Sequence, residues 1–137
     1  MPTRCAGAGV LLKVTVLFLL FALLSGCGGP STSAQYVDLA GEQFNDEEFA
    51  NAIDSCSEAI ALDPSNADAY MLRAFSYTLL RRYDDGLSDL AEAISLAPNR
   101  ADLYLYRSQI HAALGQTAKA ADDRDRALKL DPNLLSN

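Results

Sequence analysis

The 137-residue sequence has no tryptophan, one histidine and three cysteines, and its 11 lysines and arginines are outnumbered by 18 acids. Its main uncharged, apolar stretch, residues 14–24, is shorter than the roughly 20 residues that span a membrane comfortably. Residues 1–26 include two bases and no acid, so the remainder carries 9 basic against 18 acidic side chains, a net charge of −9. Nucleic acid and anionic lipid repel such a chain, and we therefore expect neither as a direct ligand.

The N-terminal segment 1–26 has the organisation of a secretory signal peptide, because basic residues flank a weakly polar start and the apolar stretch 14–24 follows. Residues 24–27, Leu-Ser-Gly-Cys, resemble the bacterial lipobox, in which the cysteine is acylated and the chain is cut just before it. The resemblance implies that residues 1–26 are removed and that Cys27 carries at least two acyl chains, enough for durable membrane attachment. The alternatives are an ordinary signal peptide with a free mature cysteine, and an uncleaved anchor.

The residues after the cysteine predict where such a lipoprotein resides. In similar lipoproteins of double-membrane bacteria an aspartate after the cysteine retains the protein on the inner membrane. Gly28 stands there, which implies the periplasmic face of the outer membrane if the organism has two membranes. Residues 27–32 then form the lipidated cysteine and a flexible tether without bulky apolar groups. With Cys5 removed in the signal peptide and Cys27 lipidated, Cys56 has no cysteine partner for a disulfide, and its apolar helical surroundings predict a small buried hydrophobe.

The rest of the chain is built on a regular internal repeat. Prolines stand at 64, 98 and 132, tyrosines at 36, 70 and 104, and alanines at 59, 93 and 127, which defines a 34-residue period. We divide the chain into units 33–66, 67–100 and 101–134, followed by a tail, 135–137. Self-similarity at this period predicts a solenoid. The apolar spacing predicts two helices in each unit, at 34–45 and 48–61, 68–80 and 84–96, and 102–114 and 118–130.

The repeated pattern resembles the tetratricopeptide repeat, which has aromatic residues at its fourth and eleventh places, small residues at its eighth, twentieth and twenty-seventh, and a proline at its thirty-second. The first unit departs from it at Gln43, and the third has His111 at an aromatic place and Ser108 at a small one. The resemblance implies an all-α fold, a tetratricopeptide-type α-solenoid of three helix-turn-helix repeats. The second unit carries the best match, with Tyr70, Ala74, Tyr77, Gly86, Ala93 and Pro98.

Arginine and aspartate occur together at two further places of the repeat. The second unit has Arg73 and Asp89 and the third has Arg107 and Asp123, whereas the first has Leu39 and Ser55 at these places. Residues that are present or absent together are expected to pair, here between the two helices of one unit. We interpret the two pairs as structural ion pairs, because a desolvated arginine needs a partner; a charged ligand site is the alternative.

The second helix of the third unit carries charge where the earlier units are apolar. Arg124 occupies the place of Cys56 and Leu90. Since that surface would otherwise pack on a following repeat, we expect this helix to end the array as its own cap.

The sequence shows no pattern typical of an enzyme. It has no phosphate-binding glycine loop, metal-ligand spacing or nucleophile elbow. His111 falls at a helix-packing position, and the acids are spread along helix surfaces instead of converging. We therefore expect no catalytic residue, metal or cofactor.

The tetratricopeptide resemblance implies that a protein or peptide partner binds in the groove lined by the first helices. Repeats that clamp a terminal carboxylate place lysine, asparagine and arginine at set positions of that groove. The matching places here have no cation, because they hold Val37, Gly41, Leu72, Asp102 and Tyr106. We expect a mostly apolar binding groove formed by Val37, Met71, Leu72, Phe75, Leu105, Tyr106 and Gln109.

Together these features predict a membrane-anchored tetratricopeptide-repeat lipoprotein that acts as a protein-interaction scaffold or adaptor in the bacterial cell envelope. Two more specific alternatives are an assembly factor for a secretin, pilus or outer-membrane complex, and a regulator of cell-wall enzymes. A hydrolase with an unrecognised site is the alternative from another class.

Overall fold

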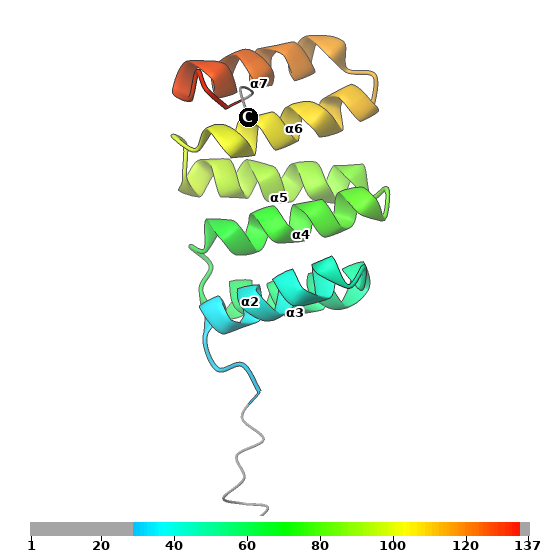
Figure 1. Cartoon of the computed structure of the whole chain (residues 1–137), viewed down its shortest axis with the longest axis vertical. Coiled ribbons are helices and arrows are strands. Elements are labelled where there is room, and N and C mark those ends of the chain that lie inside the picture. The colour runs from blue at the N-terminus through cyan, green and yellow to red at the C-terminus, as the bar shows by residue number, and fades with distance from the viewer. Residues whose placement is uncertain (1–28, 135–137) are drawn as a thin grey trace, which may run out of the picture.

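The computed structural model describes residues 29–134. They form six α-helices, α2 (Ser33–Asn45), α3 (Phe49–Leu62), α4 (Ala67–Leu79), α5 (Tyr83–Leu96), α6 (Ala101–Ala113) and α7 (Thr117–Leu130), and no strand. The helices pair as three hairpins and stack in one column, from α2 and α3 at one end to α6 and α7 at the other (Figure 1). Each bound lies within one residue of its prediction, which confirms the all-α solenoid of three helical hairpins.

Three sequence predictions fall beyond this range. The signal peptide 1–26, the lipidated Cys27 and the tail 135–137 lie outside the described residues. Among residues 29–134, no helix combines the length and apolar character that crossing a membrane requires.

Local hydrogen bonds explain where the first helices begin and end. At the start of α2, Thr32 and Gln35 form a reciprocal capping box, and the Asn66 side chain accepts from two backbone N–H groups of α4. Each first helix ends in the same turn, in which an N–H donates over 2.8 Å to the carbonyl five residues earlier (Glu48 to Gln43, Arg82 to Tyr77, Gln116 to His111). The preceding residue has positive φ in every unit, at Glu47 (63°), Arg81 (58°) and Gly115 (71°).

The core lies between the helices of each hairpin and between neighbouring hairpins. Helix α4 packs on α2 and α3, and α6 packs on α5. One cluster of buried residues contains Ala40, Ala52 and Cys56, with Leu72 of the next unit packed against it. The other contains Ala74, Leu90, Ala93, Leu103 and Ile110. Close approach accounts for Gly86, because a Cβ there would lie 3.1 Å from the Ala74 carbonyl oxygen and 3.3 Å from Ile110 Cδ1.

Candidate partner-binding surface

A row of aromatic rings runs across the three units on the first helices. The Phe75 and Tyr106 rings meet edge to face with centroids 4.3 Å apart, and the Phe44 ring lies 6.4 Å from Phe75. Phe49 of α3 extends the row, with its centroid 5.4 Å from that of Phe44. All four side chains are partly exposed. Edge-to-face rings at such distances attract one another, so the row is a preformed apolar surface.

The predicted groove residues are divided among this surface, the core, and a pocket at the end of the third unit that Leu105 and Gln109 line. Met71 and Tyr106 pack against the cluster around Leu90, and Leu72 packs against the cluster around Cys56. All three are partly buried, as are Val37, Phe75 and Leu105, whereas Gln109 is exposed. The structure therefore brings Phe75 and Tyr106 into contact, and it gives Met71, Leu72 and Tyr106 a share in packing between units.

Both arginine–aspartate pairs are bidentate and join the two helices of one unit. Arg73 donates from Nε and Nη2 to Asp89 over 2.7 and 2.8 Å, and its Nη1 donates to Ser57 Oγ over 3.0 Å. Arg107 donates to Asp123 over 2.8 and 2.6 Å. Hydrogen bonding to the aspartate raises the pKa of each arginine, more than burial lowers it. Both carboxylate oxygens are engaged in each pair, so this geometry satisfies the charges without an external ligand.

The first unit replaces the ion pair with a neutral hydrogen bond. Ser55 Oγ donates to Gln43 Oε1 over 2.7 Å. Gln43 and Ser55 are thus two departures from the repeat pattern that compensate for each other.

A further arginine joins the second and third units. Arg100 donates to Asp68 over 2.5 Å and to Asp102 over 2.6 Å, and its Nη2 lies 3.4 Å from Met71 Sδ. Hydrogen bonding to Asp102 is the main cause that raises the pKa of Arg100. Partial burial raises the pKa of Asp102, but the hydrogen bond and charge of Arg100 outweigh it, so this pKa falls below its ordinary value. Two acids neutralise this cation, which leaves it poorly suited to clamp a carboxylate.

The remaining candidate polar groups are buried. His111 is 9% exposed, and its Nδ1 lies 2.8 Å from Gln116 Oε1 while its Nε2 lies 3.8 Å from Asp123 Oδ2. Cys56 is fully buried, and desolvation raises the pKa of its thiol to about 12. Among the described residues, no three histidine, cysteine or acidic side chains are grouped to hold a metal ion.

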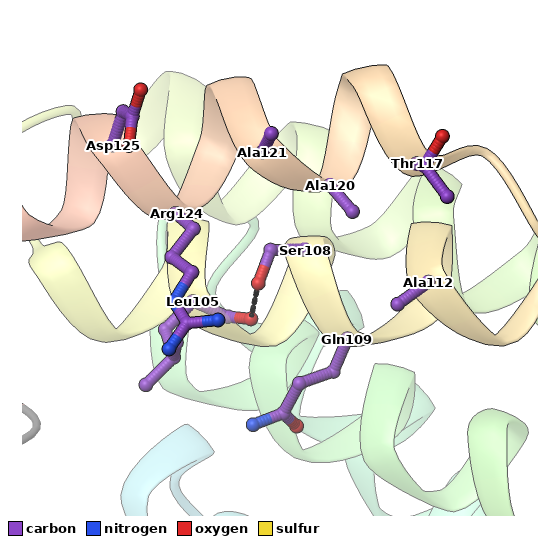
Figure 2. Close-up of a pocket in the computed structure, with 9 residues that line it drawn as sticks. All are labelled: Leu105, Ser108, Gln109, Ala112, Thr117, Ala120, Ala121, Arg124 and Asp125. Carbon is purple, nitrogen blue, oxygen red and sulfur yellow. Dashed lines mark hydrogen bonds between the residues drawn. The ribbon is translucent and has the colours of Figure 1, made fainter.

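A pocket of about 550 Å³ opens at the far end of the third unit. It lies between α6 and α7, and Arg124 extends from α7 toward Leu105 and Gln109 of α6 (Figure 2). We call it the open-end pocket. Its lining residues are Leu105, Ser108, Gln109, Ala112, Thr117, Ala120, Ala121, Arg124 and Asp125.

Sequence reasoning missed three parts of these surfaces. It gave Phe44 no role, although this aromatic residue stands next to Gln43, at a place where the repeat has an aromatic residue, and so was a signal for the row. It did not anticipate that Arg100 links two units, because Asn66 stands one period earlier and carries no charge. It interpreted Arg124 as a cap and did not predict the open-end pocket.

Comparison with known proteins supports the fold assignment. Residues 67–100, the second unit, match the tetratricopeptide repeat family. The first tetratricopeptide domain of Spaghetti (RPAP3), solved with the HSP90 peptide SRMEEVD, is 25% identical with a TM-score of 0.74, over 76% of this chain and 82% of that one. The OM64 domain of Arabidopsis is 24% identical (TM-score 0.74; 77% and 87% covered), and MamA is 22% identical (0.70; 91% and 66%). The predicted tetratricopeptide-type solenoid is therefore confirmed.

Proposed function

We propose that this protein is a membrane-anchored adaptor that holds a partner protein against the aromatic row of its first helices. The observation that carries the proposal is the continuity of that row, from Phe44 through Phe75 to Tyr106, across all three units. A scaffold that only had to stack its own repeats would not need a partly exposed ring at position 75, where the other units have Gly41 and Gln109.

The dimensions of the row suit a short segment of a partner. Neighbouring helices pack about 8–10 Å apart, so three first helices span roughly 20 Å. That length accommodates about six extended residues or one helix laid across. Because the rings are apolar, the partner segment is expected to insert an apolar side chain beside Phe75.

The pairing of the arginines distinguishes the partner segment proposed here from the peptide that the similar Spaghetti domain binds. The Spaghetti domain was solved with the peptide SRMEEVD, which is acidic at its C-terminal end. Here Arg73, Arg100 and Arg107 are each paired with aspartate. An acidic peptide therefore has no unneutralised arginine among these three to bind, and we propose that this chain takes an apolar segment instead.

Membrane attachment is the second part of the proposal. Cys27, which lies outside the described residues, follows a signal-peptide pattern and is separated from α2 by the tether. Two acyl chains there would hold the solenoid at the surface of the cell envelope, with the outer membrane implied by Gly28. The partner would then be an envelope protein, and both an assembly complex and a cell-wall enzyme fit that class.

Site-specific photo-crosslinking in cells tests the proposal. A photoreactive phenylalanine analogue replaces Phe75 in the full-length chain, and a matched chain carries it at Leu96, which is 41% exposed on a second helix. We expect one discrete crosslinked protein from position 75 that is absent from position 96, and the purified partner should bind the Phe75→Ser chain at least tenfold more weakly. The same crosslinked product from both positions, or no product from position 75, would contradict binding of the partner at the aromatic row.

A further inference from the structure

The open-end pocket is the surface on which each earlier unit stacks its successor. Its lining residues Ala120 and Arg124 correspond, one period earlier, to Gly86 and Leu90. In the second unit that surface is covered by α6, whose Tyr106 packs against the cluster containing Leu90 and whose Ile110 lies against Gly86. In the first unit α4 covers it in the same way. The described residues place no helix over the pocket of the third unit.

The 34-residue period specifies what such a helix presents. Leu72 and Tyr106 are equivalent residues of the two covering helices, and each packs against the cluster that contains Cys56 or Leu90. One period before Leu72 stands Asp38 of α2, and its side chain is exposed at the opposite end of the column. Helix α2 is therefore the one first helix in the described chain whose stacking face is uncovered.

We propose that α2 of a second copy docks in the open-end pocket, so that copies of this chain stack head to tail. In the internal junctions an apolar residue meets an apolar residue at this place. Across the proposed junction Asp38 would meet Arg124, which replaces Cys56 and Leu90. An acid thus appears on one end of the column and a cation on the other, at the two positions that the repeat brings together.

A second position supports the same register. The Phe75 ring contacts Tyr106 at 4.3 Å in the internal junction, and Gln109 is the equivalent of Phe75 in the pocket. Its amide would therefore lie beside Asp38 and can donate to the carboxylate.

The register sets no like charge directly against Asp125, the acid in the pocket. Asp125 is equivalent to Ser57, which accepts from Arg73 of the next unit. The period sets Asp125 against Leu39 of the second copy, so no like-charge pair is required at that place. Because the two surfaces differ, the contact is heterologous and can add further copies.

Charge reversal in the full-length chain tests the proposal. Sedimentation velocity in density-matched detergent, at about 0.15 M salt to screen the net charge, follows association against protein concentration. We expect the parent chain to associate in a concentration-dependent series. Asp38→Arg and Arg124→Asp should each weaken association at least tenfold, since each places like charges together. Glu92→Arg, an exposed reversal on α5 away from both ends, is the matched control and should leave association unchanged.

Mixing the two single variants gives the decisive measurement. Neither variant can stack on itself, but each presents the charge that the other lacks, so an equimolar mixture should regain parental association, as should the chain with both reversals. A parent chain that stays monomeric, a mixture that does not associate, or an equal loss in the Glu92→Arg control would overturn the proposal. If Phe75→Ser abolished association and the charge reversals did not, the copies would contact each other through the aromatic row, and the proposal would be overturned as well. The proposal does not depend on the identity of the groove partner.

Discussion

Removing one member of the Arg73–Asp89 pair should destabilise the solenoid strongly. The Asp89 side chain is 8% exposed and that of Arg73 is 19% exposed, and two hydrogen bonds join them. Breaking a buried pair costs about 3–5 kcal/mol, whereas exposed pairs contribute about 0–1 kcal/mol. Arg73 keeps its bond to Ser57 and contact with the Tyr70 ring, with 5.7 Å between Cζ and the ring centroid. We therefore expect Asp89→Ser to lower the free energy of unfolding by about 2–3 kcal/mol.

The first unit supplies a natural design for the double variant. Leu39 and Ser55 occupy the equivalent places there, so Arg73→Leu together with Asp89→Ser copies the residues of that unit. This double variant should lose only about 1 kcal/mol, because no buried charge is left unpaired. Urea unfolding followed by circular dichroism measures all four chains of the cycle, and the exposed Asp84→Ser serves as control. Additive single effects, or a cost for Asp89→Ser no larger than for Asp84→Ser, would refute the pairing as a source of stability.

Three other predictions concern Cys27, the turns after α4 and α6, and Cys56. Mass spectrometry of protein extracted from its native membrane should find an acylated N-terminal Cys27, and Cys27→Ser should abolish membrane attachment; an intact Met1 would contradict this. Arg81→Gly should raise the free energy of unfolding by about 0.5 kcal/mol and Gly115→Ala should lower it by about 1 kcal/mol, since both positions have positive φ. Because burial raises the pKa of Cys56 from 9.0 to about 12, this thiol should react with iodoacetamide at pH 8 at least about 100-fold more slowly in the folded chain than in urea. The contribution of the protonated Cys56 thiol to the free energy of unfolding is complete below pH 9 and is lost as the pH rises toward 12. A free energy of unfolding that does not fall between pH 9 and pH 12 would contradict the burial of this thiol.

The fold was predictable because its determinants recur with the period. Small residues at Ala40 and Ala74, with helix ends near each proline, recur at the same place in successive units and so were visible without coordinates. Contacts that occur only once in the chain could not be predicted in this way. Arg100 bonds to Asp68, 32 residues away, and Asn66 at the preceding equivalent position bonds instead to Ser33. No periodic signal accompanies such a contact, because each unit solves the same junction with different atoms.

The open-end pocket escaped prediction for a different reason. A charged residue on a terminal helix is compatible with a solvated cap, and Arg124 fits that interpretation. The hollow itself comes from the small residues Ala112, Ala120 and Ala121, which line it beside Arg124. Alanine at such places predicts close helix approach in an internal unit and an uncovered depression in a terminal one. Only the position of the unit in the column distinguishes the two outcomes.

The division of the groove residues between binding and packing predicts that Phe75 and Tyr106 respond differently to the same substitution. Tyr106 packs against the cluster containing Leu90, so Tyr106→Ser should lower the free energy of unfolding by about 2 kcal/mol or more. Phe75 occupies a place that is Gly41 and Gln109 in the other units, and Phe75→Ser should cost only about 1 kcal/mol, mainly the lost ring contact.

Thermal unfolding of the two variants measures this difference, with about 4–8 °C expected per kcal/mol for a domain of this size. Phe75→Ser that keeps the chain folded but no longer binds the crosslinked partner would assign the ring to recognition. A larger loss of stability for Phe75→Ser than for Tyr106→Ser would instead make the aromatic row part of the core. In that case the binding surface must lie on another face of the column, because the ring that distinguishes the second unit would already be explained by packing.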